Sequence, residues 1–269
     1  MFFRIATWNI NSIRLRLAQV FHYLDKFPAD VLCLQETKCP DNLFPREAFE
    51  AAGYKHIALS GQKSYNGVAI VSRFPFKSVE KRLFCEKKDC RHISVVIEAY
   101  DKKLRVHNFY VPAGGDVPDA QVNEKFRHKL DFLEEMFSIH ADEGDGLSSL
   151  LLGDLNIAPL ADDVWSHQQL LKVVSHTPIE TERLQALCCQ GGWVDVMRVY
   201  FPVPAKLYTW WSYRARNWSL SDRGRRLDHI WSSPDLVPFV TDVSIFRTAR
   251  GWDRPSDHVP VQTIFNFSQ

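Results

Sequence analysis

The sequence LLLGDLN, residues 150–156, decides how the rest of the chain is interpreted. Three large aliphatic residues followed by a glycine are typical of a buried central strand that ends in a turn. Asp154 and Asn156 lie two positions apart, so their side chains fall on the same side of an extended chain. Taken alone, this segment favours an Asx turn after a strand. Because similar polar strand ends occur near both ends of the chain, we expect it to mark a site of chemistry, as strand ends do in other α/β proteins.

The N-terminal region predicts two strands joined by a helix. Residues 3–8 have the pattern of a strand that leads to Asn9, and apolar residues follow at helical spacing after Ser12, the expected N-cap. Residues 31–34, VLCL, predict a second buried strand that leads to Glu36. A strand–helix–strand unit places its two strands parallel and adjacent. We therefore expect Asn9 and Glu36 to lie side by side at one edge of a sheet.

The remaining segments complete a layered α/β pattern. Between residues 54 and 110, short strand-like segments alternate with Gly, Pro and charged turns, which indicates an antiparallel meander. Further helices are expected at residues 45–52, 122–137 and 179–190, and further strands at 147–152, 227–231 and 259–267. No linker, repeat or low-complexity tract divides the 269 residues, so we expect one domain, residues 1–269, built on two sheets.

The composition is that of an ordinary globular protein, with 45% hydrophobic and 24% charged residues. No apolar run approaches the roughly 20 residues of a membrane helix, and the start MFFRIATWNI lacks the features of a signal peptide. The six cysteines show no CxxC spacing, which argues against a zinc site and favours a reduced, cytoplasmic compartment. The net charge of +1 means that any affinity for nucleic acid must come from a local basic patch.

Asp228 lies inside an apolar segment, LDHIW, residues 227–231. Burying a carboxylate without a partner costs several kcal/mol, so a partner is expected. His258, just before a predicted strand, is the natural candidate, because an Asp behind a His fixes the tautomer of the ring and stabilises its positive form. A buried Asp228 bonded to backbone amides is an equally good interpretation of that residue alone.

Oxygen-bearing side chains at the predicted strand ends match a magnesium site. Mg²⁺ prefers oxygen ligands and keeps several waters. Glu36 is the main ligand candidate, with Asn9 and Asp257 in support, although a solvated carboxylate at a strand end has the same pattern. A serine-hydrolase triad of Ser256, Asp257 and His258 is excluded, because the chain has no GxSxG motif and neighbours in sequence rarely face one another in such a triad.

Residues 208–218, YTWWSYRARNW, mix aromatic side chains with arginines. Aromatic rings that stack and cations that bind phosphate are typical of a nucleic-acid surface. A hydrophobic minicore with solvated charges is an equally consistent interpretation. The arginines that would extend a nucleic-acid surface are Arg14, Arg16, Arg223, Arg225 and Arg226.

Seven motifs in a fixed order give the chain a recognisable pattern. They are TWNINSIR at 7–14, LQETK at 34–38, GQKSYNGVAIVS at 61–72, NFYVPAGG at 108–115, GDLNIAP at 153–159, RLDHIW at 226–231 and PSDHVP at 255–260. Together they resemble the exonuclease III family of DNA-repair nucleases, within the endonuclease/exonuclease/phosphatase superfamily. LQETK and GDLNIAP carry most of the distinction from the phosphoinositide phosphatases and sphingomyelinases that share the fold.

The resemblance implies a four-layer α/β sandwich, with two mixed β-sheets packed face to face and flanked by helices. It implies a Mg²⁺-dependent phosphodiesterase, with Mn²⁺ as a substitute metal, that acts as a monomer on double-stranded DNA. The implied activities are 3′→5′ exonuclease, abasic-site endonuclease and 3′-phosphatase or phosphodiesterase, on abasic sites and on blocked or recessed 3′ ends. Two alternatives are a phosphatase of the same fold that acts on inositol phosphates or phospholipid headgroups, and a DNA-binding member without catalysis.

Residue roles are also implied by the resemblance. Asp154 would orient or deprotonate the attacking water, and Asn156 would hold Asp154 or the phosphate. His258, held by Asp228, would contact the scissile phosphate, while Tyr110 would contact phosphate near the leaving oxygen. The implied metal-binding residues are Asn9, Glu36, Asp154, Asn156, Asp257 and His258. The implied DNA-binding residues are Arg14, Trp210, Trp211, Tyr213, Arg214, Arg216, Arg225 and Leu227.

Three of these DNA-binding residues, Trp210, Trp211 and Leu227, would form the walls of a pocket for a base-free sugar. Two positions depart from parts of the family. Asn11 stands where some relatives have an Asp, which affects the outer contacts of the metal. Arg225 stands where certain relatives have an aromatic residue, which leaves the balance between the three activities open.

Overall fold

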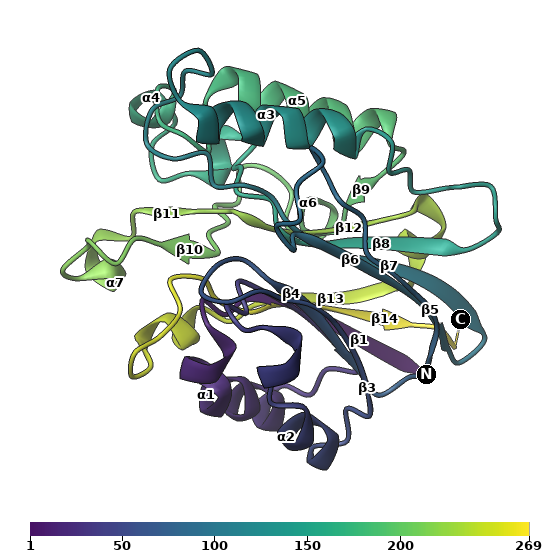
Figure 1. Ribbon diagram of the computed structural model, residues 1–269. Helices are drawn as coiled ribbons and strands as arrows, with labels where there is room; N and C mark the ends of the chain where they lie inside the picture. Colours follow the sequence, from purple (N-terminus) through teal and green to yellow (C-terminus); the bar gives the residue numbers. More distant parts are fainter. Residues whose placement is uncertain (269) are drawn as a thin grey trace.

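Strand β1 (Phe2–Asn9) lies inside the first of two six-stranded sheets in the computed structural model, which describes residues 1–268 (Figure 1). It pairs in parallel with β2 (Val31–Gln35), and α1 (Ile13–Lys26) makes the crossover between them. On its other side, β1 pairs antiparallel with β14 (Val261–Asn266). The sheet has the order β13-β14-β1-β2-β4-β3, with β13 at Val240–Ile245, β4 at Val68–Ser72 and β3 at His56–Ser60.

The second sheet has the order β5-β6-β7-β8-β12-β9. Its central strands β7 (Lys102–Tyr110) and β8 (Ser148–Asp154) are parallel, and β12 (Asp228–Ser232) runs antiparallel beside β8. The register aligns Tyr110 with Asp154, and Asp154 with Asp228, so three of the candidate residues lie on adjacent strands. The other strands are β5 (Phe76–Glu80), β6 (His92–Ala99) and β9 (Val194–Asp195).

Helices cover the outer face of each sheet, which gives the expected four layers (Figure 1). Helix α1 and the short α2 (Arg46–Ala51) lie against the first sheet, and α3 (Glu124–Met136) and α5 (Pro178–Gln190) lie against the second. The short strands β10 (Trp210–Trp211) and β11 (Gly224–Arg225) form a hairpin that carries α7 (Trp218–Ser221) and projects from the body. The remaining short helices are α4 (His167–Leu170), α6 (Val196–Tyr200), and 3₁₀ turns at Asp41–Leu43, Ala161–Asp163, Pro234–Phe239 and Arg247–Gly251. Among the residues described, no helix is both long enough and apolar enough to span a membrane.

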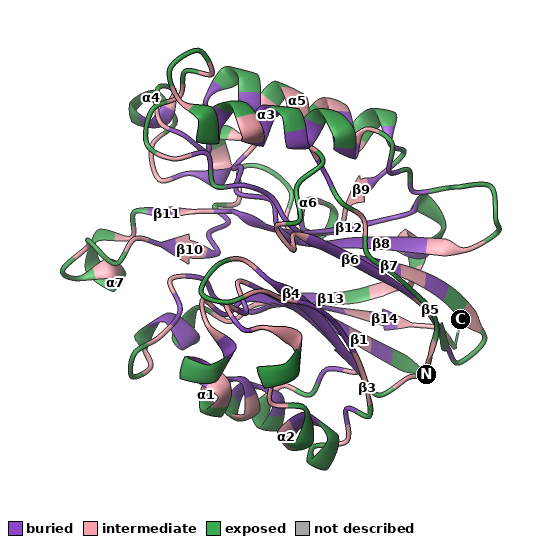
Figure 2. Ribbon diagram, in the orientation of Figure 1, coloured by how far each residue is buried: buried purple, intermediate pink, exposed green. Residues whose placement is uncertain are grey.

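The inner faces of the two sheets enclose an apolar core of fully buried side chains (Figure 2). Each buried aliphatic side chain contributes roughly 1.5–3 kcal/mol through the removal of its surface from water. Cys33 is one of these side chains, as its place in the run VLCL predicted.

Near the strand ends that carry the candidate residues, a polar seam replaces this apolar core. The amide nitrogen of Gln35 donates to Asn108 Oδ1 at 2.7 Å and to Thr7 Oγ1 at 2.9 Å. Asn108 in turn donates from β7 to the backbone carbonyls of Leu34 and Ala69 in the first sheet, at 3.0 and 2.9 Å. Because all these groups are buried, they must be bonded to one another, which fixes how the two sheets are placed.

Three local predictions were wrong. The segment from residue 54 to 110 is divided between the sheets, because β4 pairs with β3 and β2 whereas β5, β6 and β7 form the meander. Ser12 precedes α1 but has a φ of 90° and makes no capping bond. Val122 lies outside α3 and is exposed. Strand β5 was missed because its outer residues are mostly exposed and show no alternation, and β13 was missed as well.

A pair of histidines is buried in the second sheet. His92 Nε2 lies 3.1 Å from His107 Nδ1, and His107 Nε2 has no hydrogen-bond partner within residues 1–268. Burial, with a smaller effect from Arg105, lowers the pKa of His107 to about 3. His107 is therefore neutral in the folded protein at neutral pH.

Replacement of His107 by leucine is expected to make stability less dependent on pH between about pH 5 and 7. Below the unfolded pKa of about 6.5, the unfolded chain binds a proton at His107 that the folded protein does not bind. As the pH decreases below this value, the free energy of unfolding of the wild type therefore falls by up to about 1.4 kcal/mol per pH unit because of His107 alone. Urea unfolding of both proteins at several pH values measures the difference, and parallel pH profiles would contradict the assignment.

Candidate active site

The polar strand ends predicted from the sequence meet at one rim of the sandwich. Asn9 ends β1, Glu36 follows β2, and Tyr110 and Asp154 end β7 and β8. Parallel neighbouring strands, β1 with β2 and β7 with β8, end at the same edge of their sheet, so the polar residues of both sheets lie at this rim. His258 joins them from the segment before β14.

Asp154 lies at the centre of these contacts and is only 1% exposed. Asn9 Nδ2 donates to Asp154 Oδ2 at 2.8 Å and to Glu36 Oε1 at 2.9 Å, so Asn9 and Glu36 are neighbours as predicted. Asn156 adds two bonds to Asp154, from its backbone N–H to Oδ1 at 2.9 Å and from Nδ2 to Oδ2 at 3.1 Å. Asn156 has a φ of 55°, and this left-handed turn directs its N–H back to the carboxylate.

The predicted pair of Asp228 and His258 is present. His258 Nδ1 lies 2.8 Å from Asp228 Oδ2, and His258 Nε2 lies 3.6 Å from Asp154 Oδ2. Burial opposes a charge on the ring, but Asp228 and Asp154 outweigh it and raise the pKa of His258 to about 10. The imidazolium form therefore faces the rim, with Asp228 behind it.

At Asp154 the effect of burial on the pKa outweighs the effect of the nearby positive charge, whereas at His258 the nearby charges outweigh burial. Burial, together with Asp228 and Glu36, raises the pKa of Asp154 to about 7, although His258 and Asn9 act against the rise. A carboxyl group with a pKa near neutrality is suited to accept a proton in catalysis.

The residues at the rim suit a hard divalent cation. Carboxylate oxygens of Asp154 and Asp228 and a ring nitrogen of His258 lie within 4.8 Å of one another. Because the imidazolium form of His258 has no free lone pair, the two carboxylates are the metal-binding part of this group. Among residues 1–268, Asp228 Oδ1 has no hydrogen-bond partner. Glu36 Oε2 lies 2.8 Å from the ammonium of Lys38, so a positive charge already accompanies this carboxylate. Burial acts to raise the pKa of Glu36, but Lys38 and Asn9 lower it below its ordinary value, which keeps an ionised oxygen ligand at the rim.

Asp257 lies at the border between these residues and the β10–β11 hairpin. Its Oδ1 accepts from Asn11 Nδ2 at 3.2 Å, and its Oδ2 accepts from Trp210 Nε1 at 2.9 Å. Both oxygens are therefore bonded within the protein, and metal binding by Asp257 remains a prediction. Its contact with Trp210 connects the polar rim to the aromatic segment.

Several residues expected on a nucleic-acid surface are buried. Trp211 is 1% exposed, packs against Tyr208 and Trp218, and supports the hairpin from inside. Arg226 is fully buried in ion pairs with Asp163 and Asp195. Two further expected surface residues, Leu227 and Arg16, are also buried, and Arg16 donates to the backbone carbonyl of Arg254 at 2.9 Å. The minicore interpretation is correct for Trp211, whereas the burial of the charged side chains of Arg16 and Arg226 was not predicted.

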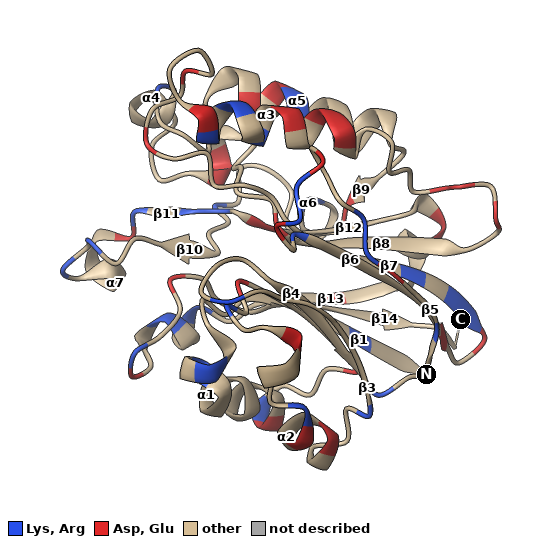
Figure 3. Ribbon diagram, viewed as in Figure 1, with Lys and Arg blue, Asp and Glu red and all other residues tan. Residues whose placement is uncertain are grey.

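The other predicted residues lie at the surface beside the rim. Figure 3 shows basic residues along the β10–β11 hairpin and near α7. The predicted DNA-binding residues that are exposed are Arg14 of α1 and Tyr213, Arg214, Arg216 and Arg223 of the hairpin region. Trp210 is half-buried, with the guanidinium of Arg225 5.2 Å from its ring centre. Arg225 also donates to the backbone carbonyl of Val174 at 3.0 Å and to Ser175 Oγ at 2.8 Å.

Two buried charged residues behind the site were not predicted. Lys129 of α3 donates to Glu180 Oε1 of α5 at 2.5 Å and to the carbonyl of Asn156 at 2.8 Å, and both side chains are fully buried. Glu180 also accepts bonds from the backbone N–H groups of Ser175 and Thr177. This pair therefore holds the loop that contains Asn156 against the two outer helices. The sequence feature that could have predicted this buried pair is the position of Lys129 between Phe126 and Leu130 on the apolar face of a helix.

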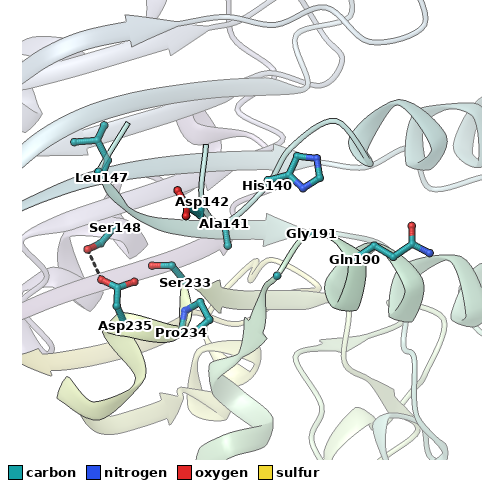
Figure 4. Close-up of a pocket in the computed structure, with 12 residues that line it drawn as sticks. His140, Ala141, Asp142, Leu147, Ser148, Gln190, Gly191, Ser233, Pro234 and Asp235 are labelled. Carbon is teal, nitrogen blue, oxygen red and sulfur yellow. Dashed lines mark hydrogen bonds between the residues drawn. The ribbon is translucent and has the colours of Figure 1, made fainter. Parts of the chain in front are cut away.

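A separate hollow of about 610 Å³ lies at the other end of β8, where its lining includes His140, Asp142 and Gln190 (Figure 4). Ser148, which begins β8, bonds there to Asp235 at 2.5 Å. The length of β8 separates this hollow from Asp154, so it is not part of the candidate site.

Replacement of Lys129 by methionine is expected to reduce the free energy of unfolding by about 3–5 kcal/mol, because Glu180 is left buried without a cation. Chemical denaturation measures the change. The double variant Lys129→Met/Glu180→Gln removes both charges and should recover part of the loss. A double variant as unstable as Lys129→Met would show that the unpaired charge is not the cause.

Comparison with known proteins gives a consistent result over almost the whole chain. The model of the endonuclease/exonuclease/phosphatase family matches residues 6–258. Exodeoxyribonuclease III of Haemophilus influenzae is 30% identical, and the alignment covers 97% of this chain and 99% of that protein. An AP endonuclease structure from Archaeoglobus fulgidus is similar at a TM-score of 0.89 and 33% identity, covering 98% and 99% of the two chains. A Neisseria 3′ phosphatase bound to a product DNA hairpin gives the same TM-score and identity, with 98% and 100% covered.

Proposed function

The chain belongs to the exonuclease III family within the endonuclease/exonuclease/phosphatase superfamily, and we propose that its rim hydrolyses phosphodiester bonds at lesions and 3′ ends of duplex DNA. It is a DNA-repair hydrolase of the exodeoxyribonuclease III and AP endonuclease type. The observation that carries the proposal is the convergence of Glu36, Asp154 and His258 at one rim. The whole chain acts as one catalytic domain, as a monomer in the cytoplasm.

Mg²⁺ is the proposed metal, with Mn²⁺ as a substitute. Glu36 would be its main ligand, Asn9 and Asp257 would support it from neighbouring positions, and Asp154, Asn156 and His258 would complete the polar surroundings. An oxygen-rich set without cysteine favours these hard cations over zinc. When bound, the cation supplies positive charge that polarises the scissile phosphate.

Hydrolysis then depends on a proton acceptor and on donors aimed at the phosphate. Asp154 accepts a proton from the attacking water as the water oxygen bonds to phosphorus, and Asn9 and Asn156 hold the carboxylate in place. The imidazolium of His258, fixed by Asp228, donates to a phosphate oxygen and stabilises its growing negative charge.

Tyr110 donates a hydrogen bond to the leaving oxygen as the bond between that oxygen and phosphorus breaks. Burial raises the pKa of Tyr110 well above its ordinary value of 10, and Glu36 and Asp154 act in the same direction. The hydroxyl therefore stays protonated at neutral pH and can donate to the leaving oxygen.

DNA is held by the exposed cations and by a pocket beside them. Arg14, Arg214 and Arg216 contact phosphates, and Tyr213 contacts the strand between them. Trp210, which packs against the cluster of buried residues that contains Leu227, forms one wall of the pocket for a base-free sugar. Arg225, which lies over Trp210, forms the other wall, because Trp211 is buried as well.

The first test is cleavage of a duplex with one abasic analogue and of a duplex with a recessed 3′ end, in the presence of Mg²⁺. The wild type should cut both, and Asp154→Asn should lower turnover by at least about 10²–10³-fold, on the scale of losing one group that stabilises the transition state. It should still bind DNA, because the shape of the side chain is kept. Asp142→Asn, at an exposed position outside the site, is the control and should cut normally.

No cleavage of either duplex by folded wild type would end the proposal. Cleavage by Asp154→Asn within a few-fold of wild type would instead remove only the role given to Asp154.

Replacement of Trp210 by alanine should reduce incision at an abasic analogue more than removal of a 3′-phosphate. The reason is that a flipped, base-free sugar needs the wall of the pocket, whereas a terminal phosphate reaches the rim directly. Steady-state kcat/KM for the two substrates gives the ratio, with the 3′-phosphatase rate as the internal control. Equal losses on both substrates would reject the pocket.

A further inference from the structure

A second hollow lies on the same rim as the site, at the ends of β3 and β6. It measures about 280 Å³ and is formed mainly by residues 81–91, the connection between β5 and β6, together with Asp41, Ser60 and Gly61. The cationic residues in its lining are Lys81, Arg82, Lys87, Lys88 and Arg91. The lining contains two carboxylates, Asp41 and Asp89, against these five cations, so positive charge is in excess in the lining itself. Three further acidic residues, Glu86, Asp131 and Glu135, lie in or beside the same connection, close to Cys85.

The positive charge is not fully neutralised within the protein. Lys81 pairs with Asp41 at 3.3 Å, and Arg91 pairs with Asp89. Lys87 and Lys88 are both exposed, and neither forms an ion pair with any residue between 1 and 268. Two cationic side chains are therefore free for an external anion.

The hollow is in direct contact with the catalytic residues through Arg91. The guanidinium of Arg91 lies 4.8 Å from the centre of the Tyr110 ring and donates to the Tyr110 carbonyl at 3.2 Å. The Tyr110 N–H donates back to the Arg91 carbonyl at 2.8 Å. A phosphate in the hollow would thus be adjacent to the residue assigned to the leaving oxygen.

The order of the strands places the hollow opposite the β10–β11 hairpin. The two sheets pack with β12 over β14, β1 over β8, β2 over β7, and β3 and β4 over β6. Trp210 of the hairpin forms a bridge to His258, on the side of β12 and β14. The catalytic residues come from the middle strands, and the hollow lies on the side of β3 and β6. The hairpin, the catalytic residues and the hollow therefore follow one another along the rim.

We propose that this hollow binds a backbone phosphate of the DNA on the side of the scissile bond away from the hairpin. The proposal rests on the proposed function, since a duplex cut at the centre of the rim must extend in both directions. A net charge of only +1 makes such local patches necessary, because binding to phosphates depends on local cations that release counterions.

The test is the salt dependence of DNA binding by the full chain with Lys87→Gln/Lys88→Gln. The slope of log Kd against log salt should fall by about two, because each substitution removes one interaction between a lysine and a phosphate. Affinity at moderate salt should fall roughly tenfold. The control, Lys102→Gln/Lys103→Gln, removes an adjacent lysine pair at the opposite end of β7 from Tyr110 and should leave the slope unchanged.

A second measurement locates the phosphate along the duplex. Duplexes are lengthened on one side or the other of an abasic analogue, and wild-type affinity should rise with length on both sides. For the Lys87/Lys88 variant, affinity should stop rising with length on one side only. The proposal would be overturned by a salt slope that is unchanged in the Lys87/Lys88 variant, or by a slope that falls equally in this variant and in the Lys102/Lys103 control. It would also be overturned if the affinity of the Lys87/Lys88 variant no longer rose with duplex length on either side. If the wild type still cleaves a short duplex, the proposed function stands, and only the proposal for the hollow has failed.

Discussion

The hydrogen bond from Asn9 to Asp154 joins the two sheets at the point where chemistry is expected, and a second bond from Asn9 holds Glu36 at the end of the first sheet. A carboxylate that is 1% exposed is costly unless donors and opposite charges surround it. Asn9, Asn156 and His258 supply these groups, and they can do so only when both sheets are correctly placed. The seam of Gln35 and Asn108 directly behind them fixes that placement. The burial that makes Asp154 reactive is therefore also what makes the arrangement of the sheets specific.

Local rules of chain geometry predicted a large part of this arrangement. The strand–helix–strand unit placed Asn9 beside Glu36, and the cost of burying Asp228 pointed to His258. Predictions failed where the partner is remote in sequence or where two faces of a strand had to be distinguished. Trp210 and Trp211 are adjacent, and nothing in the sequence decides which of them faces inward. Arg226 was expected on the surface because its partner Asp163 lies 63 residues away.

Burial separates the charged residues of the chain into two groups with different physical roles. Lys129 with Glu180, and Arg226 with Asp163, are fully buried pairs that hold loops in place and contribute little field at the surface. The exposed cations lie on the hairpin and on the connection between β5 and β6, on either side of the catalytic residues. A chain that is almost neutral overall can in this way present exposed cations on both sides of its acidic catalytic residues.

The pairing of β1 with β14 joins two segments that are far apart in the sequence. Asn9 ends β1, and His258 lies in the segment before β14, so the same pairing brings both side chains to the rim. Contacts between residues so remote in sequence cost more chain entropy to close and slow folding. A partly folded chain therefore lacks the arrangement in which the imidazolium lies beside Asp154.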